Sequence, residues 1–283
     1  MMLKVQRIAC ITPLIAVTSL KNTLPMVTIL VHETVFGPIH SRRLGSSLGV
    51  NLSPIDGKIC SFDCLYCEAG YNAQGQGHAG VPSRTTVKHK LAEKLKSLKE
   101  SGEPLDVITF SGNGEPTVHP QFAEIIADTL KLRDRYFPEV KVNVLTNSTF
   151  AFNAKVAAAL KKVDGNIVKL DSAVNHTMFA INRPVNPNVT VEGLIADLRQ
   201  FAGQCIVQTM IVRGEHDGQR IDNSTEAEVD ALIEAYKSIG PREVMIYSID
   251  RATPEEHLEK VPKEELQAIA ERIKAAGITA TAY

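Results

Sequence analysis

An α/β fold with a parallel sheet is the architecture that this sequence predicts, and two observations support it. Short apolar runs alternate with amphipathic helical patterns from about residue 27 onward, and this order repeats through six or more units. Polar and glycine-rich segments follow the successive runs, as expected where parallel strands end at one rim. Such an order gives either an open doubly wound sheet or a full or partial barrel.

Seven apolar runs are expected to be strands. They cover residues 48–52, 105–112, 140–147, 166–172, 205–212, 243–250 and 278–283. Helices are expected where apolar residues recur at spacings of three and four, around 122–130, 191–198, 229–236 and 266–273. Thr225 and Glu228 form a possible capping box, Pro262 lies near a helix start, and Gly277 lies just past a helix end.

Length and composition describe an ordinary globular chain. Its 283 residues suffice for one large α/β barrel or two ordinary domains, and a hydrophobic content of 44% is enough to bury a full core. A formal net charge of −1 excludes the strongly basic overall charge that is typical of nucleic-acid-binding proteins. A local basic patch would not show in the net charge. Composition therefore neither identifies nor excludes RNA as a partner.

The first 26 residues differ in pattern from the rest of the chain. Two basic residues precede an apolar run that is similar to a secretory signal, but the run contains Pro13 and is too short to span a bilayer. We expect residues 1–26 to be an extension outside the core, with the true start near Met26, and residues 27–283 to form a single domain. A signal peptide and an ordered cap are the alternatives. Cys10 lies in this extension and is a poor ligand candidate.

Three of the five cysteines lie within eight residues, in the stretch GKICSFDCLYCEAG. A disulfide is excluded because three is odd and the spacings of Cys60, Cys64 and Cys67 bring all three sulfurs to one place. A shared metal is the better interpretation. A structural zinc ion needs four ligands, and His78 is the nearest candidate for the fourth. An iron–sulfur cluster is the other destination for thiolates, and a cubane held by three of them has one iron without a protein ligand.

The chain resembles the radical S-adenosylmethionine (SAM) superfamily over nearly its whole length after about residue 35. The resemblance rests on Cys-x3-Cys-x2-Cys after the first strand, with Tyr66 before the last cysteine, and on Gly-Glu-Pro in SGNGEPTVHP after the second strand. Within the superfamily, FGPIHSRRLGSSLGVNLSPIDGKICSFDCLYCEAG is most similar to the branch that includes the tRNA 4-demethylwyosine synthases and many bacterial iron–sulfur oxidoreductases. The thiol motif is highly specific, whereas Gly-Glu-Pro alone is weak.

This resemblance implies a partial (β/α)6 TIM-like barrel of parallel strands with two cofactors, a 4Fe–4S cluster and S-adenosyl-L-methionine. Cys60, Cys64 and Cys67 would hold the cluster, whose unique iron would chelate the amino and carboxylate groups of SAM. Reductive cleavage would give methionine and a 5′-deoxyadenosyl radical, which abstracts hydrogen from a substrate. The missing fourth thiol is then the position that SAM fills.

The same resemblance assigns cofactor-binding roles to the two motifs. Tyr66 is expected to pack beside the adenine of SAM. Gly112, Asn113, Gly114 and Glu115 are expected near the methionine ammonium, where flexible backbone lets acceptors approach. Asn113 replaces a glycine that is usual in the superfamily. The alternatives are an aromatic that supports the loop and a plain strand-to-helix turn.

Six residues at or beyond the ends of later strands are assigned to SAM in the same way: Asn147, Asp171, Ser172, Arg213, Tyr247 and Ile249. The first three are expected near the methionine carboxylate or the ribose hydroxyls, because a carboxylate accepts from both hydroxyls and an amide can donate to a carboxylate. Arg213 is expected at the methionine carboxylate and the last two in the adenine pocket. The alternatives are solvated strand ends, an ion pair of Asp171 with Lys169 or Arg183, a surface arginine, and core packing.

Other features stay open at this point. Arg42, Arg43 and Arg183 could face the substrate, and surface arginine is the alternative. The basic stretch 84–100 could meet an RNA backbone or an acidic partner, but regularly spaced lysines on a helix usually form a solvated face. Cys205 lies in an apolar strand and is expected to be a small buried hydrophobe.

The sequence therefore predicts an oxygen-sensitive radical SAM enzyme of the cytoplasm, with a small molecule, protein or RNA as its unidentified substrate and a reductant such as flavodoxin or ferredoxin. No membrane association is expected. Wyosine-type tRNA modification is an alternative, but it resembles a pattern with further upstream cysteines for a second cluster, and only Cys10 lies upstream here. Two further interpretations stay open, a glycyl-radical enzyme activase and a non-enzymatic zinc- or cluster-binding module.

Overall fold

The computed structural model describes residues 29–41 and 45–283, so the predicted extension with Cys10, together with Arg42 and Arg43, lies outside the described residues. An eight-stranded sheet has the order β1-β2-β3-β4-β5-β6-β9-β11. Its parallel strands are β2 (Gly45–Val50), β3 (Val107–Phe110), β4 (Lys141–Thr146), β5 (Gly165–Lys169), β6 (Ile206–Met210), β9 (Glu243–Tyr247) and β11 (Ala280–Ala282). The seven expected strands are therefore confirmed.

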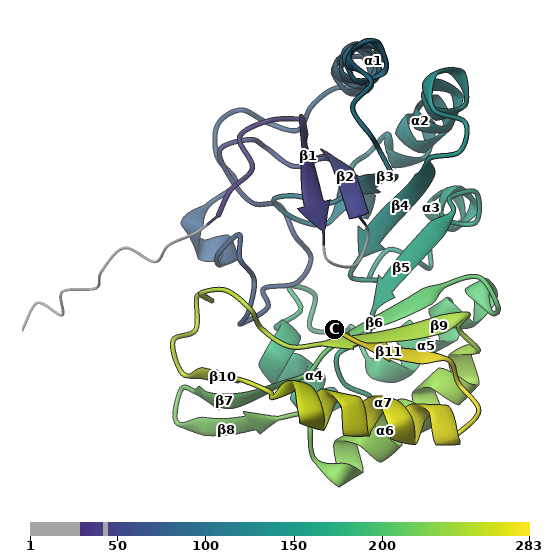
Figure 1. Cartoon of the computed structure of the whole chain (residues 1–283). Coiled ribbons are helices and arrows are strands. Elements are labelled where there is room, and N and C mark those ends of the chain that lie inside the picture. Colours follow the sequence, from purple (N-terminus) through teal and green to yellow (C-terminus); the bar gives the residue numbers. More distant parts are fainter. Residues whose placement is uncertain (1–28, 42–44) are drawn as a thin grey trace, which may run out of the picture.

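Helices connect these parallel strands, as Figure 1 shows. They are α1 (Arg84–Ser101), α2 (Phe122–Tyr136), α3 (Ala154–Leu160), α4 (Asn175–Asn182), α5 (Val191–Leu198), α6 (Glu226–Ile239) and α7 (Lys263–Ala275), with short 3-10 turns η1 (Asn72–Gln74), η2 (Pro116–Val118) and η3 (Arg199–Phe201). Each strand from β2 to β6, and then β9, is followed by at least one helix before the next parallel strand. The fold is a partial (β/α)6 TIM-like barrel, as the sequence predicts.

The helix ends follow the expected signals in part. Thr225 caps α6, because its side chain accepts a hydrogen bond from the backbone N–H of Glu228 at 3.3 Å. The reciprocal half of the capping box is absent, since the Glu228 carboxylate accepts from Ser172 and Thr177 instead. Pro262 precedes α7 as expected. The basic stretch 84–100 forms α1, which buries one apolar stripe: Val87, Leu91, Leu95 and Leu98.

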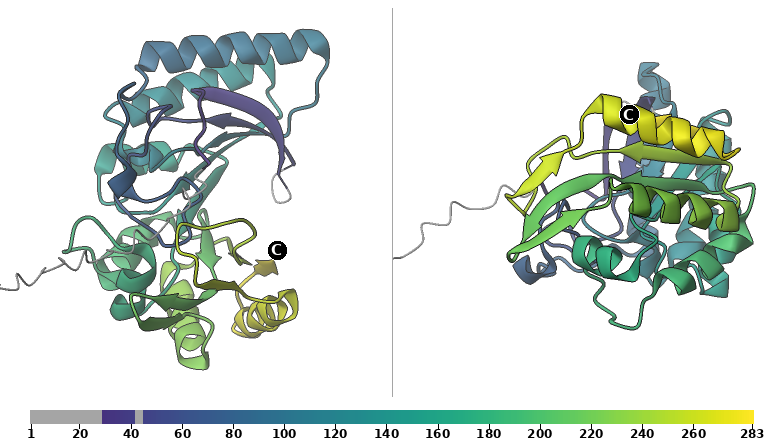
Figure 2. Two further views of the ribbon diagram at one scale, coloured as in Figure 1. Left: turned by 90° about the vertical axis from the view of Figure 1, so that its left-hand side faces the viewer. Right: turned by 90° about the horizontal axis from the view of Figure 1, so that it is seen from below.

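Side chains alternate between the two faces of the sheet, and each face has its own core. The outer face packs against the helices through a continuous set of buried residues that includes Leu48, Ile108, Phe110, Val142, Val144, Val168, Val207, Val244 and Ile246. A smaller apolar group on the inner face comprises Ile167, Ile206 and Met245, with Leu145 against it. The views in Figure 2 show the helices outside the curved sheet. The carboxyl ends of the strands therefore open onto the inner side of a half-barrel.

Four strands were not expected from the sequence. β1 (Val35–Ser41) runs antiparallel to β2 at the sheet edge. A second sheet has the order β10-β7-β8, with β7 (Val212–His216), β8 (Gln219–Asp222) and β10 (Leu258–Lys260). The predicted rim loop after the fifth strand is thus a hairpin. Its turn is Asp217–Gly218, and both residues have positive φ, 50° and 74°.

Candidate active site

The cysteine loop lies between β2 and α1 and is joined directly to the turn that follows β3. Ile59 and Gly114 form a parallel bridge. The N–H of Ile59 donates to the carbonyl of Asn113 at 3.1 Å, and the N–H of Glu115 donates to the carbonyl of Ile59 at 3.0 Å. The two motifs that the sequence singled out, Cys-x3-Cys-x2-Cys and Gly-Asn-Gly-Glu, are therefore in contact.

This contact requires glycine at two positions. Gly114 has φ +155°, and a Cβ atom there would lie 1.9 Å from the carbonyl oxygen of Ile59. Gly112 has φ +147°, and its Cβ would lie 2.5 Å from Oδ1 of Asn51. Neither approach is possible for a residue with a side chain. The glycines bring the backbone of the Gly-Asn-Gly-Glu turn against the cysteine loop.

Asn113, which stands where the superfamily usually has glycine, is fully buried, and its side chain is bonded to backbone groups. Its amide accepts from the N–H of Val31 at 2.7 Å and donates to the carbonyls of Val31 at 2.8 Å and Pro54 at 2.9 Å. The structure thus uses this side chain to hold the segment before β1. Its contact with the methionine ammonium stays a prediction.

Glu115 is buried and ties the turn to the end of β4. Its carboxylate accepts from Thr146 Oγ1 at 2.7 Å, from the N–H of Asn147 at 2.6 Å and from the N–H of Thr117 at 3.0 Å. Burial raises the pKa of Glu115, although these hydrogen bonds oppose that shift. Asn147 in turn donates from Nδ2 to Ser61 Oγ at 2.8 Å and lies 3.6 Å from Cys60 Sγ. Asn147 therefore reaches the cysteine loop.

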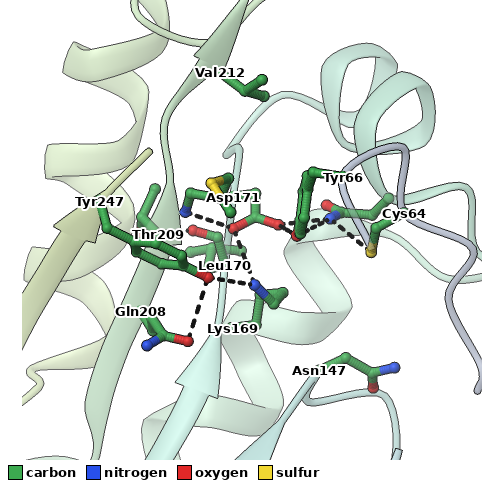
Figure 3. Close-up of polar contacts among 12 residues, drawn as sticks. Cys64, Tyr66, Asn147, Lys169, Leu170, Asp171, Gln208, Thr209, Val212 and Tyr247 are labelled. Atoms are coloured by element: carbon green, nitrogen blue, oxygen red, sulfur yellow. Dashed lines mark hydrogen bonds and ion pairs between the residues drawn. The ribbon is translucent and has the colours of Figure 1, made fainter. Parts of the chain in front are cut away.

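Asp171 is the centre of a buried network beyond the end of β5, shown in Figure 3. The hydroxyl of Tyr66 donates to its Oδ2, Asn182 Nδ2 donates to the same oxygen at 2.6 Å, and the N–H of Met210 donates to Oδ1 at 2.8 Å. Nδ2 of Asn182 also lies 3.4 Å from Cys64 Sγ. The network therefore connects β5 and β6 to the cysteine loop.

Lys169 belongs to this network, and the sequence did not single it out as a site residue. Its ammonium donates to the hydroxyl of Tyr247 at 3.1 Å, lies 3.8 Å from Oδ1 of Asp171, and stands 5.0 Å from the centre of the Tyr66 ring. Burial by itself would lower the pKa of Lys169, but the Asp171 carboxylate and its other neighbours raise it above the usual value. The sequence did carry a signal for Lys169 as a site residue. It lies two residues after Ile167 in a buried strand and therefore on the same inward face.

The remaining predicted residues lie outside this network. Ser172 donates to Glu228 at 2.7 Å and helps to begin α4. Arg213 is on β7, is paired with Glu265 of α7, and lines a pocket of about 590 Å³ in the second sheet. Ile249 is partly buried against the apolar residues around the cysteine loop. Arg183 pairs with Asp63 at 3.9 Å and not with Asp171.

The three thiols have surroundings that fit an iron–sulfur cluster. Cys64 is 8% exposed, and burial raises the pKa of its thiol to about 11. In the part of the chain that the structure describes, no three His, Cys, Asp or Glu side chains converge as the ligands of a single metal ion would. This disfavours the zinc alternative, in which thiolates share one ion at about 2.3 Å. His78, its proposed fourth ligand, is exposed. Each thiolate of a cubane binds a different iron, so the donor set fits a cluster.

Apolar residues surround this loop: Phe62, Leu65, Met178, Ile181, Met210 and Val212 are buried with Cys64 and Tyr66. They restrict the access of water to Cys64, whereas Cys60 and Cys67 are partly exposed. Cys205, by contrast, lies in the main core and is fully buried, as expected. The three thiols therefore lie near the carboxyl ends of the parallel strands, which is where barrels of this kind bind their ligands.

Known proteins share both the sequence pattern and the fold. Residues 55–226 match the family model of the Radical SAM superfamily. Among solved structures, a radical SAM methyltransferase from Sphaerobacter thermophilus superposes with a TM-score of 0.63 at 16% identity, covering 84% of this chain and 65% of that chain. A structure of TYW1 with a lysine–pyruvate adduct bound gives 0.58 at 14% identity, covering 82% and 75%. At these identities the two superpositions show the fold alone.

The chain therefore belongs to the radical SAM superfamily of enzymes and, within it, to the UPF0026 proteins. A UPF0026 protein of Synechocystis sp. is 32% identical over 78% of this chain and 77% of its own length. One from Helicobacter pylori strain J99 is 30% identical over 77% of this chain. The chain spans 66% and 58% of the length of the two matched Helicobacter pylori proteins. The structure adds that no helix in the described ranges is long and apolar enough to cross a membrane.

Proposed function

We propose that this radical SAM enzyme holds a 4Fe–4S cluster with Cys60, Cys64 and Cys67 and binds S-adenosyl-L-methionine at the adjoining rim. One observation carries the proposal: the cysteine loop is joined to the Gly-Asn-Gly-Glu turn through Ile59 and to the end of β5 through Tyr66 and Asp171. The thiols and the segments expected to bind SAM therefore meet at one place. When bound, the cluster would supply the electron that cleaves SAM and so starts hydrogen abstraction from a substrate.

The chain's own residues have defined tasks in this proposal. Asn147 and Asn182 direct their amide N–H groups at the sulfurs of Cys60 and Cys64, at 3.6 and 3.4 Å, and would orient the thiolates. Lys169 places a positive charge beside Cys64 and between the rings of Tyr66 and Tyr247. These contacts fix the loop on the inner side of the half-barrel.

The contacts to SAM are supported unequally. Tyr66 belongs to the cysteine loop and donates a hydrogen bond to Asp171, which favours their roles at the adenine and the ribose. Asp171 already accepts from three donors, so ribose hydroxyls would have to share or replace them. Arg213 has less support as the partner of the methionine carboxylate, because its guanidinium is paired with Glu265. A reductant such as flavodoxin or ferredoxin is expected to supply electrons.

Wyosine-type tRNA modification and glycyl-radical enzyme activation have no observation that favours them here. The superposition with TYW1 shows a shared fold, and the expected ligands of a second cluster are missing, since Cys10 is the one cysteine upstream of the triad. Hydrogen abstraction from an unidentified substrate is therefore the form in which we propose the activity.

Anaerobic reconstitution with iron and sulfide tests the proposal. The wild type should take up a cluster and release 5′-deoxyadenosine from SAM under reducing conditions. Cys64→Ala should remain folded but lose both, because two thiolates do not hold the cubane. Cys205→Ala, a matched control in the core, should keep the cluster. A loaded wild type without 5′-deoxyadenosine would show a binding module, and a zinc content without sulfide would overturn the ligand set.

A further inference from the structure

A buried lysine lies at the base of the cysteine loop, apart from the network around Asp171. The side chain of Lys58 is 2% exposed. Its ammonium donates to the carbonyl of Gly70 at 2.6 Å and lies 3.4 Å from Oδ1 of Asp63. Both partners belong to the loop that carries the three cysteines. Lys58 therefore spans the interior of this loop from its beginning to its end.

The ammonium of Lys58 shares its carboxylate partner with a second cation. Asp63 is the carboxylate within ion-pair distance of Lys58, and it is shared with the guanidinium of Arg183 at 3.9 Å. The Asp63 carboxylate also accepts a hydrogen bond from the N–H of Asn72 at 2.6 Å, so much of its negative charge is already engaged. The Lys58 side chain is 2% exposed, whereas that of Arg183 is 38% exposed, so Lys58 is the buried cation of this group. A buried ammonium that shares its carboxylate is stabilised by a further anion bound nearby.

The thiols are the groups placed to supply that negative charge. Lys58 is two residues before Cys60, its partner Asp63 directly precedes Cys64, and its partner Gly70 is three residues after Cys67, so its ammonium lies inside the loop that carries the three thiols. Lys169 also contacts this loop, because its ammonium stands 5.0 Å from the centre of the Tyr66 ring. The loop is thus flanked by two ammonium groups, and Lys58 is the one that takes no part in the rim network.

We propose that Lys58 is a fixed counter-charge that raises the reduction potential of the cluster held by Cys60, Cys64 and Cys67; the inference rests on the proposed function. One electron from a low-potential carrier takes the iron–sulfur core from 2+ to 1+, so the charge of core and three thiolates goes from −1 to −2. A buried cation nearby stabilises the more negative state. The net charge around a cluster is a main determinant of its potential. Lys58 is therefore a positioning residue with an electrostatic effect.

A redox titration followed by electron paramagnetic resonance, without SAM and substrate, measures this effect. Lys58→Met keeps the length of the side chain and removes the charge. It should shift the reduction equilibrium at least tenfold toward the oxidised state, which is about 59 mV for a one-electron couple. Lys58→Arg should stay near the wild type. Asp63→Asn should shift the potential upward, because it removes a negative charge and leaves an acceptor for Asn72. Lys131→Met, an exposed residue on α2, is the matched surface control and should change nothing.

Iron and sulfide content is measured on every sample, so that a lost cluster is separated from a shifted potential. A lower potential in Lys58→Met at full occupancy supports the proposal, and a wild-type potential there overturns it. Should Lys58→Met fail to hold the cluster, Lys58→Gln decides, because it removes the same charge and keeps a donor for the carbonyl of Gly70: a lower potential supports the counter-charge and a wild-type potential refutes it. A wild type that takes up no cluster would instead refute the proposed function, so the two failures are distinguishable.

Discussion

The hydroxyl of Tyr66 donates a hydrogen bond to the carboxylate of Asp171, and this contact joins the cysteine loop to the end of β5. Tyr66 directly precedes Cys67, and Asp171 is 1% exposed. The same carboxylate accepts from a backbone N–H of β6. A substitution at Asp171 therefore removes contacts of the loop that carries the three cysteines as well as a contact of β6.

Asp171→Ala should lower the free energy of unfolding by about 3–5 kcal/mol, because it leaves three buried donors without an acceptor and Lys169 without its counter-charge. A ribose contact would add a loss of at least tenfold in SAM affinity per folded molecule, since about 1.4 kcal/mol is one decade. Chemical unfolding and anaerobic SAM binding on the same reconstituted variant separate the two effects. Lower stability with wild-type affinity would retire the ribose role.

Gly114→Ala should destabilise the chain and prevent cluster uptake. Its Cβ would collide with the carbonyl of Ile59, which lies one residue before Cys60, so the cysteine loop would have to move. Gly203→Ala is the matched control: it also has a positive φ, +73°, but no atom lies within 4 Å of the new Cβ. It should cost about 1–2 kcal/mol and leave the iron content unchanged. Equal iron content in both variants would contradict the close-approach argument.

Asp128→Asn should lower the free energy of unfolding at neutral pH by about 1–2 kcal/mol. The expected loss is this small because the Arg84 side chain is 41% exposed and water screens the ion pair. The Asp128 carboxylate receives Arg84 Nε at 2.7 Å and Nη2 at 3.0 Å, and this hydrogen bonding holds its pKa below 3.8. When folding lowers the pKa of a carboxyl group, the ionised group stabilises the folded state. This contribution is complete at pH values above the pKa of the unfolded state, and it is lost as pH falls through the pKa of the folded state. The difference between wild type and variant should therefore begin to shrink as pH falls below about 3.8 and should vanish below the lowered folded-state pKa, in urea unfolding series. A difference that persists in acid would show that the ion pair is not its cause.

A chain that begins at Met26 should fold and take up a cluster like the full chain, because every described contact of the site lies downstream. A chain that begins at Val35 should lose about 2–4 kcal/mol, since Asn113 then loses both contacts to Val31 and the carbonyl of Thr34 no longer accepts from Asn51. Thermal unfolding of the two truncated chains measures the difference. Equal stability would show that residues 26–34 contribute nothing to it. Export with cleavage near residue 20 would support a signal peptide.

Strand positions were predictable from sequence because parallel strands that are buried on both faces appear as continuous apolar runs. β3, with the sequence VITF, is buried at all four positions. β1 was not expected because it contains Pro38, which a sheet tolerates at its edge. The β7–β8 hairpin did carry a signal, Asp217–Gly218, which is a preferred two-residue turn. Reading the segment as a rim loop overlooked that pair.

The thiol triad could be identified because its chemistry and spacing are local, whereas the partners of the other site residues are not. Asn113 binds Val31, Ser172 binds Glu228, and Arg213 binds Glu265, and these partners lie 82, 56 and 52 residues away. No short pattern encodes such pairs. Where the sequence suggested a contact with a cofactor, the folded chain supplies a protein partner, and the roles at SAM stay predictions.

The contacts of the cysteine loop with the last third of the chain have a consequence for biosynthesis. Glu68 accepts from Arg251 at 2.6 Å, and the carbonyl of Leu65 accepts from the N–H of Glu255. Roughly 190 residues separate these partners, so at about 5–20 residues per second a ribosome needs about 10–40 s to deliver them after the thiols have been made. During that interval the loop lacks these two contacts, although the buried apolar residues that surround it are made before the interval ends. Under the proposed function, we expect stable cluster uptake only after the last third of the chain has been made.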